Sequence, residues 1–537
     1  MKNINKIILL FIILLAIVLR VYKLSKVPPS LYWDEASLGY NAYSILLTAR
    51  DEYGKFLPLT NFAAFGDYKP PGYIYAAVPS VAIFGLNEFA IRFPSALFGT
   101  LTVLLIYLIS KRLFESEIIS QIAALFLAIS PWHLQFSRGA FEANLGLFFS
   151  TLGIFLFLKF AQDKAFYLFI SLLSFLAAMY TFTGQRLFVP FILLVLVLQF
   201  KKQIFTNLRL VTVTTVVAIF LFWPLFKFAT GTIEGRLRFN EVTIFKDLKP
   251  IDDSRRHQAK DDYSWWTNLI HNRRFFYAHE YLKHYSDAFN PGFLFFHGDF
   301  NPRLSIQEVG ELYYLDLPFI LAGIYFLFKK NEKYRFLIIG WLLVSPLGPA
   351  TARETPHALR MIHILPVLIL ISSYGAYNLI KNLKFNKIFI AALCAALLIN
   401  FLYYLHMYYI HWPLNYSGDW QYGYKQAVDV AKTYYSQVDQ IIVTKSMGRP
   451  YIYFLFYTNY DPEIYQQTAK VTRDQFYFLD VEGFDKFIFT DSPSTASLKG
   501  KTLFIVRPDD LPDDATKVTS VNNLIGESVF DIGIASR

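Results

Sequence analysis

The chain has 537 residues, of which 54% are hydrophobic, 18% aromatic and only 17% charged. Soluble domains usually carry about 25% charged residues, so the charged fraction of this chain is too low for a soluble protein. The same numbers exclude a disordered chain, a collagen and a coiled coil, and they predict a polytopic α-helical membrane protein. The single cysteine, Cys394, excludes a disulfide framework and a cysteine-based metal site. The formal net charge is +10. Its Lys and Arg residues lie between apolar runs, which is typical of membrane loops, and no nucleic-acid partner is expected.

The apolar runs predict about eleven transmembrane helices. The first run, Ile4 to Val21, follows Lys2 and Lys6 and is interpreted as an uncleaved signal anchor with a cytoplasmic N-terminus. Ten further runs are about 16–21 residues long, enough to cross a bilayer. They lie near 90–110, 117–135, 143–160, 164–181, 186–200, 210–228, 311–328, 335–350, 359–379 and 387–406.

Basic residues then orient the spans in the plasma (inner) membrane. If 90–110 is the second span, the cytoplasmic loops carry 14 Lys and Arg residues, against four in the short outer loops. The positive-inside rule therefore predicts outer loops at 23–89, 136–143, 229–310 and 350–359. Counting Pro71 to Gly85 as a span would reverse this pattern, and its helix would be only about 22 Å long. We interpret it as a helix on the outer membrane surface.

Residues 412–537 differ from the rest in being more polar. Short strand-like runs occur at Gln440–Thr444, Lys486–Thr490 and Thr502–Val506, with a helical stretch near 424–436. We expect a transmembrane domain over 1–411 and a small extracytoplasmic α/β domain over 412–537.

Outer loop one holds the densest set of reactive side chains. Asp34 and Glu35 follow a Pro-Pro pair and open a helical stretch. A carboxylate beside apolar neighbours at a membrane surface suits a general base, although Asp34 could equally cap that helix. Lys69 precedes Pro70 and Pro71, at a depth where an ammonium can meet a lipid phosphate. The alternative is a snorkelling interfacial lysine.

The other outer loops add weaker candidates. Arg138 and Glu142 lie four residues apart, so they either pair on one helical face or supply a cation and a second carboxylate to the site. His357 and Arg360 share a helical face suited to phosphate, and a capping role fits as well. His297 and Asp299 are further accessory candidates. The histidines of this loop match no recognised metal-binding spacing. A divalent metal is therefore not predicted, although the sequence does not exclude one.

These parts are those that an enzyme needs when its leaving group is a lipid phosphate. A cation stabilises the departing phosphate and a carboxylate takes the proton of an attacking hydroxyl. Segment 28–142 resembles the polyprenyl-phosphate-dependent C-type glycosyltransferases, which include the protein O-mannosyltransferases and the lipid A aminoarabinose transferases. The matching pieces are Asp34-Glu35, Lys69-Pro70-Pro71, Glu88 with Arg92-Phe93-Pro94-Ser95-Ala96, and Arg138 with Glu142.

The resemblance implies an inverting transfer of a mannose-like hexose or a pentose from an undecaprenyl- or dolichyl-phosphate donor to an extracytoplasmic hydroxyl. Asp34 would be the base and Lys69 the phosphate ligand, with Glu142 as second carboxylate, and with Arg138 and Arg360 binding phosphate or ordering loops. The aminoarabinose transferases hold a metal through an acidic residue just before the lysine; that position is Tyr68 here, so the metal is not carried over. The sugar and the acceptor (a protein, a glycolipid or a cell-wall glycan) stay open.

Two other classes of function compete with this interpretation. A transporter or lipid flippase would place polar residues and paired repeats near the bilayer midplane, and the spans here carry few charges and no visible repeat. An adhesion or sensing protein would use residues 412–537 and need far fewer spans than eleven.

Overall fold

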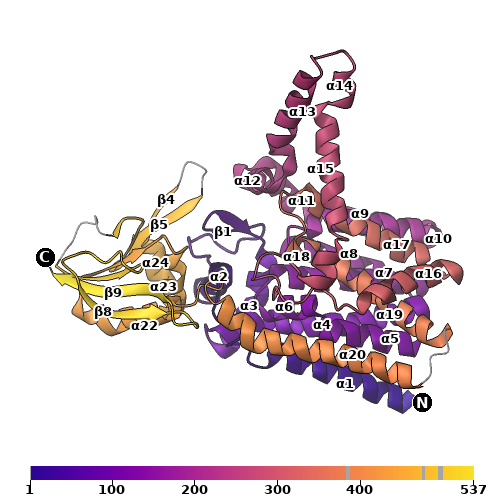
Figure 1. Cartoon of the computed structure of the whole chain (residues 1–537), viewed down its shortest axis with the longest axis horizontal. Coiled ribbons are helices and arrows are strands. Elements are labelled where there is room, and N and C mark those ends of the chain that lie inside the picture. Colours follow the sequence, from indigo (N-terminus) through magenta and orange to yellow (C-terminus); the bar gives the residue numbers. More distant parts are fainter. Residues whose placement is uncertain (1, 383–386, 474–477, 494–499, 537) are drawn as a thin grey trace. The chain divides into compact units, whose positions relative to one another are not determined.

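The computed structural model describes residues 2–382, 387–473, 478–493 and 500–536. Lys384, one of the 14 basic residues that the sequence assigns to cytoplasmic loops, lies outside these ranges. The chain divides into two compact units (Figure 1). Unit 1 comprises Met1–Arg20, Leu97–Ser137 and Glu142–Tyr404, and unit 2 comprises Val21–Ala96, Arg138–Phe141 and Leu405–Arg537. Each unit is described by itself.

Unit 1 is built from helices formed by the apolar runs. A chain in lipid must satisfy its backbone hydrogen bonds internally, which favours helices. These are α1 (Lys2–Val21), α4 (Glu88–Phe114, whose first turns belong to unit 2), α5 (Glu117–Ile129), α6 (Pro131–Arg138), α7 (Glu142–Gln162), α8 (Tyr167–Thr181), α9 (Gln185–Gln199), α10 (Lys201–Thr206), α11 (Leu208–Gly231), α16 (Asp316–Lys329), α17 (Arg335–Val344), α19 (Leu365–Asn382) and α20 (Lys387–His406). Helices α16 and α19 can pack closely because Gly375 has no Cβ. A Cβ at this position would collide with the carbonyl oxygen of Phe319.

The predicted count of eleven spans is not confirmed. Within the described residues, six helices are long and apolar enough to cross a membrane, or seven if the bent pair α5 and α6 is one span. That pair bends by 55°, at Ser130 and Pro131. Helices α8 and α9 have only 15 residues each. Hydropathy counts apolar residues, but it does not register where a proline or glycine ends the helix.

Segment 229–310, which the sequence predicts to be an outer loop without naming elements in it, is largely helical. Helices α13 and α15 run side by side in the upper part of Figure 1. The elements are α12 (Ile233–Val242), η1 (Ile244–Lys246), α13 (Lys249–Lys260), α14 (Thr267–Ile270), α15 (Arg273–Asp287) and η2 (Gly292–Phe296). Short turns η3 (Ser345–Leu347), η4 (Pro349–Thr351), α18 (Ala358–Met361) and η5 (Ile362–Ile364) precede α19.

Unit 2 joins outer loop one to the C-terminal residues. Loop one forms α2 (Trp33–Thr48), the hairpin β1 (Phe62–Ala64) and β2 (Asp67–Lys69), and α3 (Pro71–Phe84). The C-terminal elements are η6 (Met407–His411), α21 (Trp412–Asn415), α22 (Tyr424–Tyr434), η7 (Tyr435–Gln437), β3 (Gln440–Thr444), α23 (Pro450–Thr458), α24 (Pro462–Thr468), β4 (Lys470–Arg473), β5 (Leu479–Phe484), β6 (Phe487–Thr490), β7 (Lys501–Val506), β8 (Thr516–Asn522) and β9 (Ser528–Ser536).

The C-terminal strands form one mixed sheet in the order β4-β5-β6-β3-β7-β9-β8. The central strand β3 pairs in parallel with β6 and β7, and the other pairs are antiparallel. All five residues of β3 are buried, as expected for a strand covered on both faces. The three strand-like runs predicted from sequence are therefore strands β3, β6 and β7, and the predicted helical stretch is α22.

Candidate active site

Asp34 lies in the first turn of α2, where the positive end of the helix dipole favours a carboxylate. The N-cap residue of α2 is Tyr32, and no side-chain cap is formed there, so Asp34 does not cap this helix. Its Oδ1 lies 2.8 Å from Lys69 Nζ, with 24% of the Asp34 side chain exposed. Two side chains 35 positions apart thus form one ion pair that solvent or a ligand can reach from the carboxylate side.

Lys69 ends strand β2 of a tight hairpin. Phe62 pairs with Lys69 and Ala64 with Asp67, so only Phe65 and Gly66 form the turn, and Gly66 adopts φ +66°. The Lys69 side chain is only 11% exposed, and its Nζ also lies 3.1 Å from Asp67 Oδ2. A snorkelling lysine would keep its ammonium in water. Lys69 is instead held between two carboxylates.

Glu35 forms a fully buried ion pair with Arg92 of α4. The guanidinium donates from Nε to Glu35 Oε1 at 2.9 Å and from Nη2 to Oε2 at 2.8 Å, and both side chains are 0% exposed. Glu35 Oε1 also accepts from the backbone N–H of Ala140 at 2.8 Å. Glu35 therefore fixes the start of α2 to two other segments of unit 2, and it does not face solvent.

Arg92 also binds the chain that leads into α2. It donates to the carbonyl oxygens of Leu24, Pro28 and Ser30. These bonds hold the segment before α2 in place, and with it the position of the Asp34 carboxylate. A bidentate pair of this kind gives a fixed geometry as well as energy.

Arg138 is buried among backbone oxygens and tyrosines. Its Nη2 donates to the carbonyls of Tyr22 (2.7 Å) and Val27 (3.0 Å), and its Nε donates to the hydroxyl of Tyr408 (3.1 Å). The side chain is 1% exposed. Of the two roles expected for Arg138, these contacts support the ordering of loops.

The remaining predicted residues belong to unit 1. Glu142 opens α7, and its place opposite Asp34 stays a prediction. Asp299 is the centre of a second polar group: its Oδ2 accepts from Ala358 N at 2.6 Å and lies 3.9 Å from His357 Nδ1. Burial raises the pKa of Asp299. Arg360 lies close enough to lower that pKa, although its own ion pair is with Glu354 at 3.6 Å.

His297 is the last of the predicted accessory residues. His297 Nδ1 lies 3.0 Å from the Gly298 carbonyl oxygen. Over the part of the chain that the structure describes, no three His, Cys, Asp or Glu side chains are arranged to hold a metal ion. Metal independence stays a prediction.

The chain is similar to one protein family and to several solved structures. Residues 68–227 match the family described as dolichyl-phosphate-mannose-protein mannosyltransferase. ArnT from Cupriavidus metallidurans matches over 98% of this chain and 97% of its own, with TM-score 0.56 and 10% identity in the apo state. With undecaprenyl phosphate bound, the TM-score is 0.57 and the identity 11%. This chain has the fold of ArnT. The resemblance inferred from the sequence is confirmed.

A longer protein of known structure also matches. The Archaeoglobus fulgidus oligosaccharyltransferase, tethered to an acceptor peptide containing the NVT sequon, matches over 85% of this chain with TM-score 0.50 and 15% identity. The chain spans 63% of the length of that protein. No curated protein matches the sequence.

From the sequence, no role in the site is assigned to two side chains, Asp67 and Arg92. Asp67 contacts Lys69 because residues i and i+2 of a strand lie on the same face; only the position directly before the lysine was considered. The carbonyl contacts of Arg92 depend on tertiary structure, and no local pattern indicates them. The assembled pair of Asp34 and Lys69 can take up a proton at one end and neutralise a phosphate at the other.

Proposed function

We propose that this chain is an inverting glycosyltransferase that moves a sugar from a polyprenyl-phosphate donor to an extracytoplasmic acceptor hydroxyl. The observation that carries the proposal is the 2.8 Å contact between Asp34 Oδ1 and Lys69 Nζ. The match of residues 68–227 to a mannosyltransferase family and the ArnT structure with undecaprenyl phosphate support the choice of donor.

The reaction is a single displacement at the anomeric carbon. The acceptor oxygen forms a bond to this carbon while the bond to the donor phosphate oxygen breaks, so the configuration inverts. The acceptor proton passes to the Asp34 carboxylate, and the electron pair of the broken bond leaves with the polyprenyl phosphate. Lys69 stabilises the charge that develops on that phosphate.

The other residues support this pair. Glu35 and Arg92 position Asp34 through the buried ion pair, and Arg138 orders the loop around it. We assign Glu142 as a second carboxylate and Arg360 as a further phosphate contact, with His357, His297 and Asp299 as accessory groups of the outer face. The proposed setting is a multi-pass protein of the plasma (inner) membrane with a cytoplasmic N-terminus and the site outside, where a lipid-linked sugar serves as activated donor.

The test is transfer of label from a panel of radiolabelled polyprenyl-phosphate sugars. Purified full-length protein in liposomes is incubated with each donor and with an envelope extract that is separated afterwards into protein, lipid and polysaccharide. We expect label to pass from one donor, a hexose such as mannose or a pentose, into one fraction. Counterflow of a labelled solute without any sugar transfer would instead favour the transporter alternative.

A further inference from the structure

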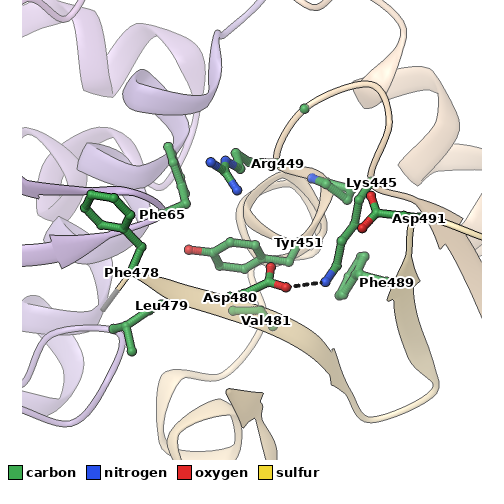
Figure 2. Close-up of a pocket in the computed structure, with 12 residues that line it drawn as sticks. Phe65, Lys445, Arg449, Tyr451, Phe478, Leu479, Asp480, Val481, Phe489 and Asp491 are labelled. Carbon is green, nitrogen blue, oxygen red and sulfur yellow. Dashed lines mark hydrogen bonds and ion pairs between the residues drawn. The ribbon is translucent and has the colours of Figure 1, made fainter. Parts of the chain in front are cut away.

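A polar pocket lies within unit 2, next to the loop-one hairpin. It has a volume of about 220 Å³ and is bounded by the turn of the β1–β2 hairpin, strands β5 and β6, and the loop between β3 and α23 (Figure 2). No residue of the proposed catalytic pair lines it. Phe65, which does, lies four positions before Lys69 in the same hairpin.

Aromatic rings form the walls of this pocket. Phe65, Tyr451 and Phe489 follow one another at centroid distances of 6.0 and 6.5 Å, each pair edge to face. All three side chains are buried, and the Tyr451 hydroxyl is held at 3.0 Å from the hydroxyl of Tyr53. The walls are therefore rigid. Ring faces carry partial negative charge and attract the C–H groups of a sugar ring.

Charged side chains at the pocket balance one another. Lys445 Nζ lies 2.6 Å from Asp480 Oδ2, the contact drawn as a dashed line in Figure 2. Arg449 and Asp491 add one charge of each sign. Two cations and two carboxylates leave no net charge, which disfavours a strongly acidic or basic ligand. They offer both donors and acceptors, and hydroxyl groups use both.

The size and position of the pocket further limit which ligands it could bind. Pockets for drug-sized ligands occupy about 300–1,000 Å³, so a volume of about 220 Å³ suits one ring-sized unit. The loop on its rim also comes close to the start of α2: a Cβ on Gly448 would lie 3.1 Å from the ring of Trp33, the residue before Asp34. Arg449 lies over the Phe65 ring at 5.8 Å.

From these contacts we propose that the pocket binds one neutral sugar unit of the acceptor, so that the acceptor is a glycan and not a peptide. The proposal rests on the proposed function and names its acceptor class. The rim loop and the hairpin connect the pocket to Asp34 and Lys69, and the neighbouring sugar of the same glycan would present the hydroxyl that reacts.

The test is saturation-transfer NMR on the full-length protein in nanodiscs. The probes are mannotriose and maltotriose as neutral glycans, and a Ser/Thr-rich peptide as the protein-like alternative. Leu479→Trp places a larger side chain in the pocket. Leu524→Trp is the matched control, because Leu524 is 36% exposed in the turn between β8 and β9, at the opposite edge of the sheet. Asp480→Asn breaks the ion pair with Lys445 at constant volume.

We expect a signal from at least one trisaccharide, reduced by about tenfold or more in Leu479→Trp, weakened in Asp480→Asn and unchanged in Leu524→Trp. No signal from either trisaccharide, an equal signal in Leu479→Trp, or a pocket-dependent signal from the peptide alone would overturn the proposal. If glycan binding holds while no donor supports transfer, the proposed function fails and the pocket assignment stands.

Discussion

The ammonium of Lys69 is held in place by two ion pairs. Its ammonium has two carboxylate partners, Asp34 at 2.8 Å and Asp67 at 3.1 Å, and little exposure of its own. The ammonium is therefore held in a fixed position between two partly exposed carboxylates, of which Asp34 is the more exposed, at 24% against 17% for Asp67. The arrangement is preorganised, which is what stabilisation of a developing charge requires.

Replacing Lys69 by Met should lower kcat/KM by about 100- to 1,000-fold, the usual loss for a removed charge-stabilising donor. Lys69→Arg keeps the charge but not the compact ammonium, so it should retain more activity than Met. Transfer of labelled sugar and binding of undecaprenyl phosphate by the same preparations measure both effects. Wild-type transfer by Lys69→Met would contradict the assignment.

The buried ion pair of Glu35 should contribute more to the free energy of unfolding than an exposed ion pair does. Glu35→Gln leaves the buried Arg92 guanidinium without its counter-charge, which typically destabilises a protein by about 3–5 kcal/mol. Asp429→Asn is the matched control, because Asp429 and its partner Lys432 are 59% and 45% exposed and such surface pairs contribute about 0–1 kcal/mol. The midpoint of thermal unfolding should fall clearly for the first variant only. Equal midpoints would show that the buried pair does not hold this part of unit 2.

The resemblance to a known family predicts Asp34 and Lys69 as site residues, and the structure shows them in contact. What the sequence could not show is how each is held. The carbonyls that bind Arg92, and the backbone N–H of Ala140 on Glu35, come from segments far apart along the chain. Such partners depend on the whole fold, and no local pattern encodes them.

Among the elements, the turn after α2 contains an unusual buried acid. Glu52 is 0% exposed; its Oε1 accepts from Asn41 Nδ2 at 3.1 Å, and burial raises the pKa of Glu52 from 4.5 to about 8. Between these two pH values the folded protein keeps a proton that the unfolded chain has released. Stability therefore falls as pH rises from about 4.5 to about 8, by up to about 1.4 kcal/mol per pH unit.

Glu52→Gln should remove this dependence, since the amide does not titrate. The midpoint of thermal unfolding, measured from pH 5 to pH 8, should fall less steeply for the variant than for the wild type, and the variant should be the more stable protein near pH 8. Glu482→Gln, an exposed position on β5, is the control and should follow the wild type. Parallel curves for Glu52→Gln and wild type would contradict this account.

The elements also show how far periodicity can predict a fold. Strand β3 follows from a short continuous apolar run, and helix α22 from apolar residues that recur at helical spacing. Long apolar runs are less informative: the run near 117–135 is two helices with a 55° bend, because Pro131 cannot continue the preceding hydrogen bonds. Length and hydropathy alone therefore overcount straight spans.

For the whole molecule, unit 2 is the main addition to what the sequence predicts. Outer loop one and the C-terminal residues form one compact unit. Trp33 N donates to Gln421 Oε1 at 2.9 Å, and the Tyr40 hydroxyl donates to the carbonyl of Tyr460 at 3.1 Å. These contacts join residues about 400 positions apart, which a boundary at 411/412 does not describe. A functional division at that boundary stays a prediction.

The orientation in the membrane is tested by cysteine labelling. In a Cys394→Ser background, Lys55→Cys lies in outer loop one and Lys202→Cys in a predicted cytoplasmic loop, and both positions are exposed. An impermeant maleimide on intact cells should label Lys55→Cys and should reach Lys202→Cys only after permeabilisation. The reverse pattern would place the proposed site in the cytoplasm.

The central claim is that Asp34 takes the proton of the acceptor. Its most direct test is the rate of sugar transfer from the donor that the wild type uses, measured for Asp34→Asn beside the matched control Asp419→Asn, an exposed carboxylate of the same unit. Loss of a general base lowers rates by about 100- to 10,000-fold. We predict such a loss for Asp34→Asn, with an unchanged unfolding midpoint, and near-normal transfer for Asp419→Asn. Near-normal transfer by a folded Asp34→Asn protein would contradict the account.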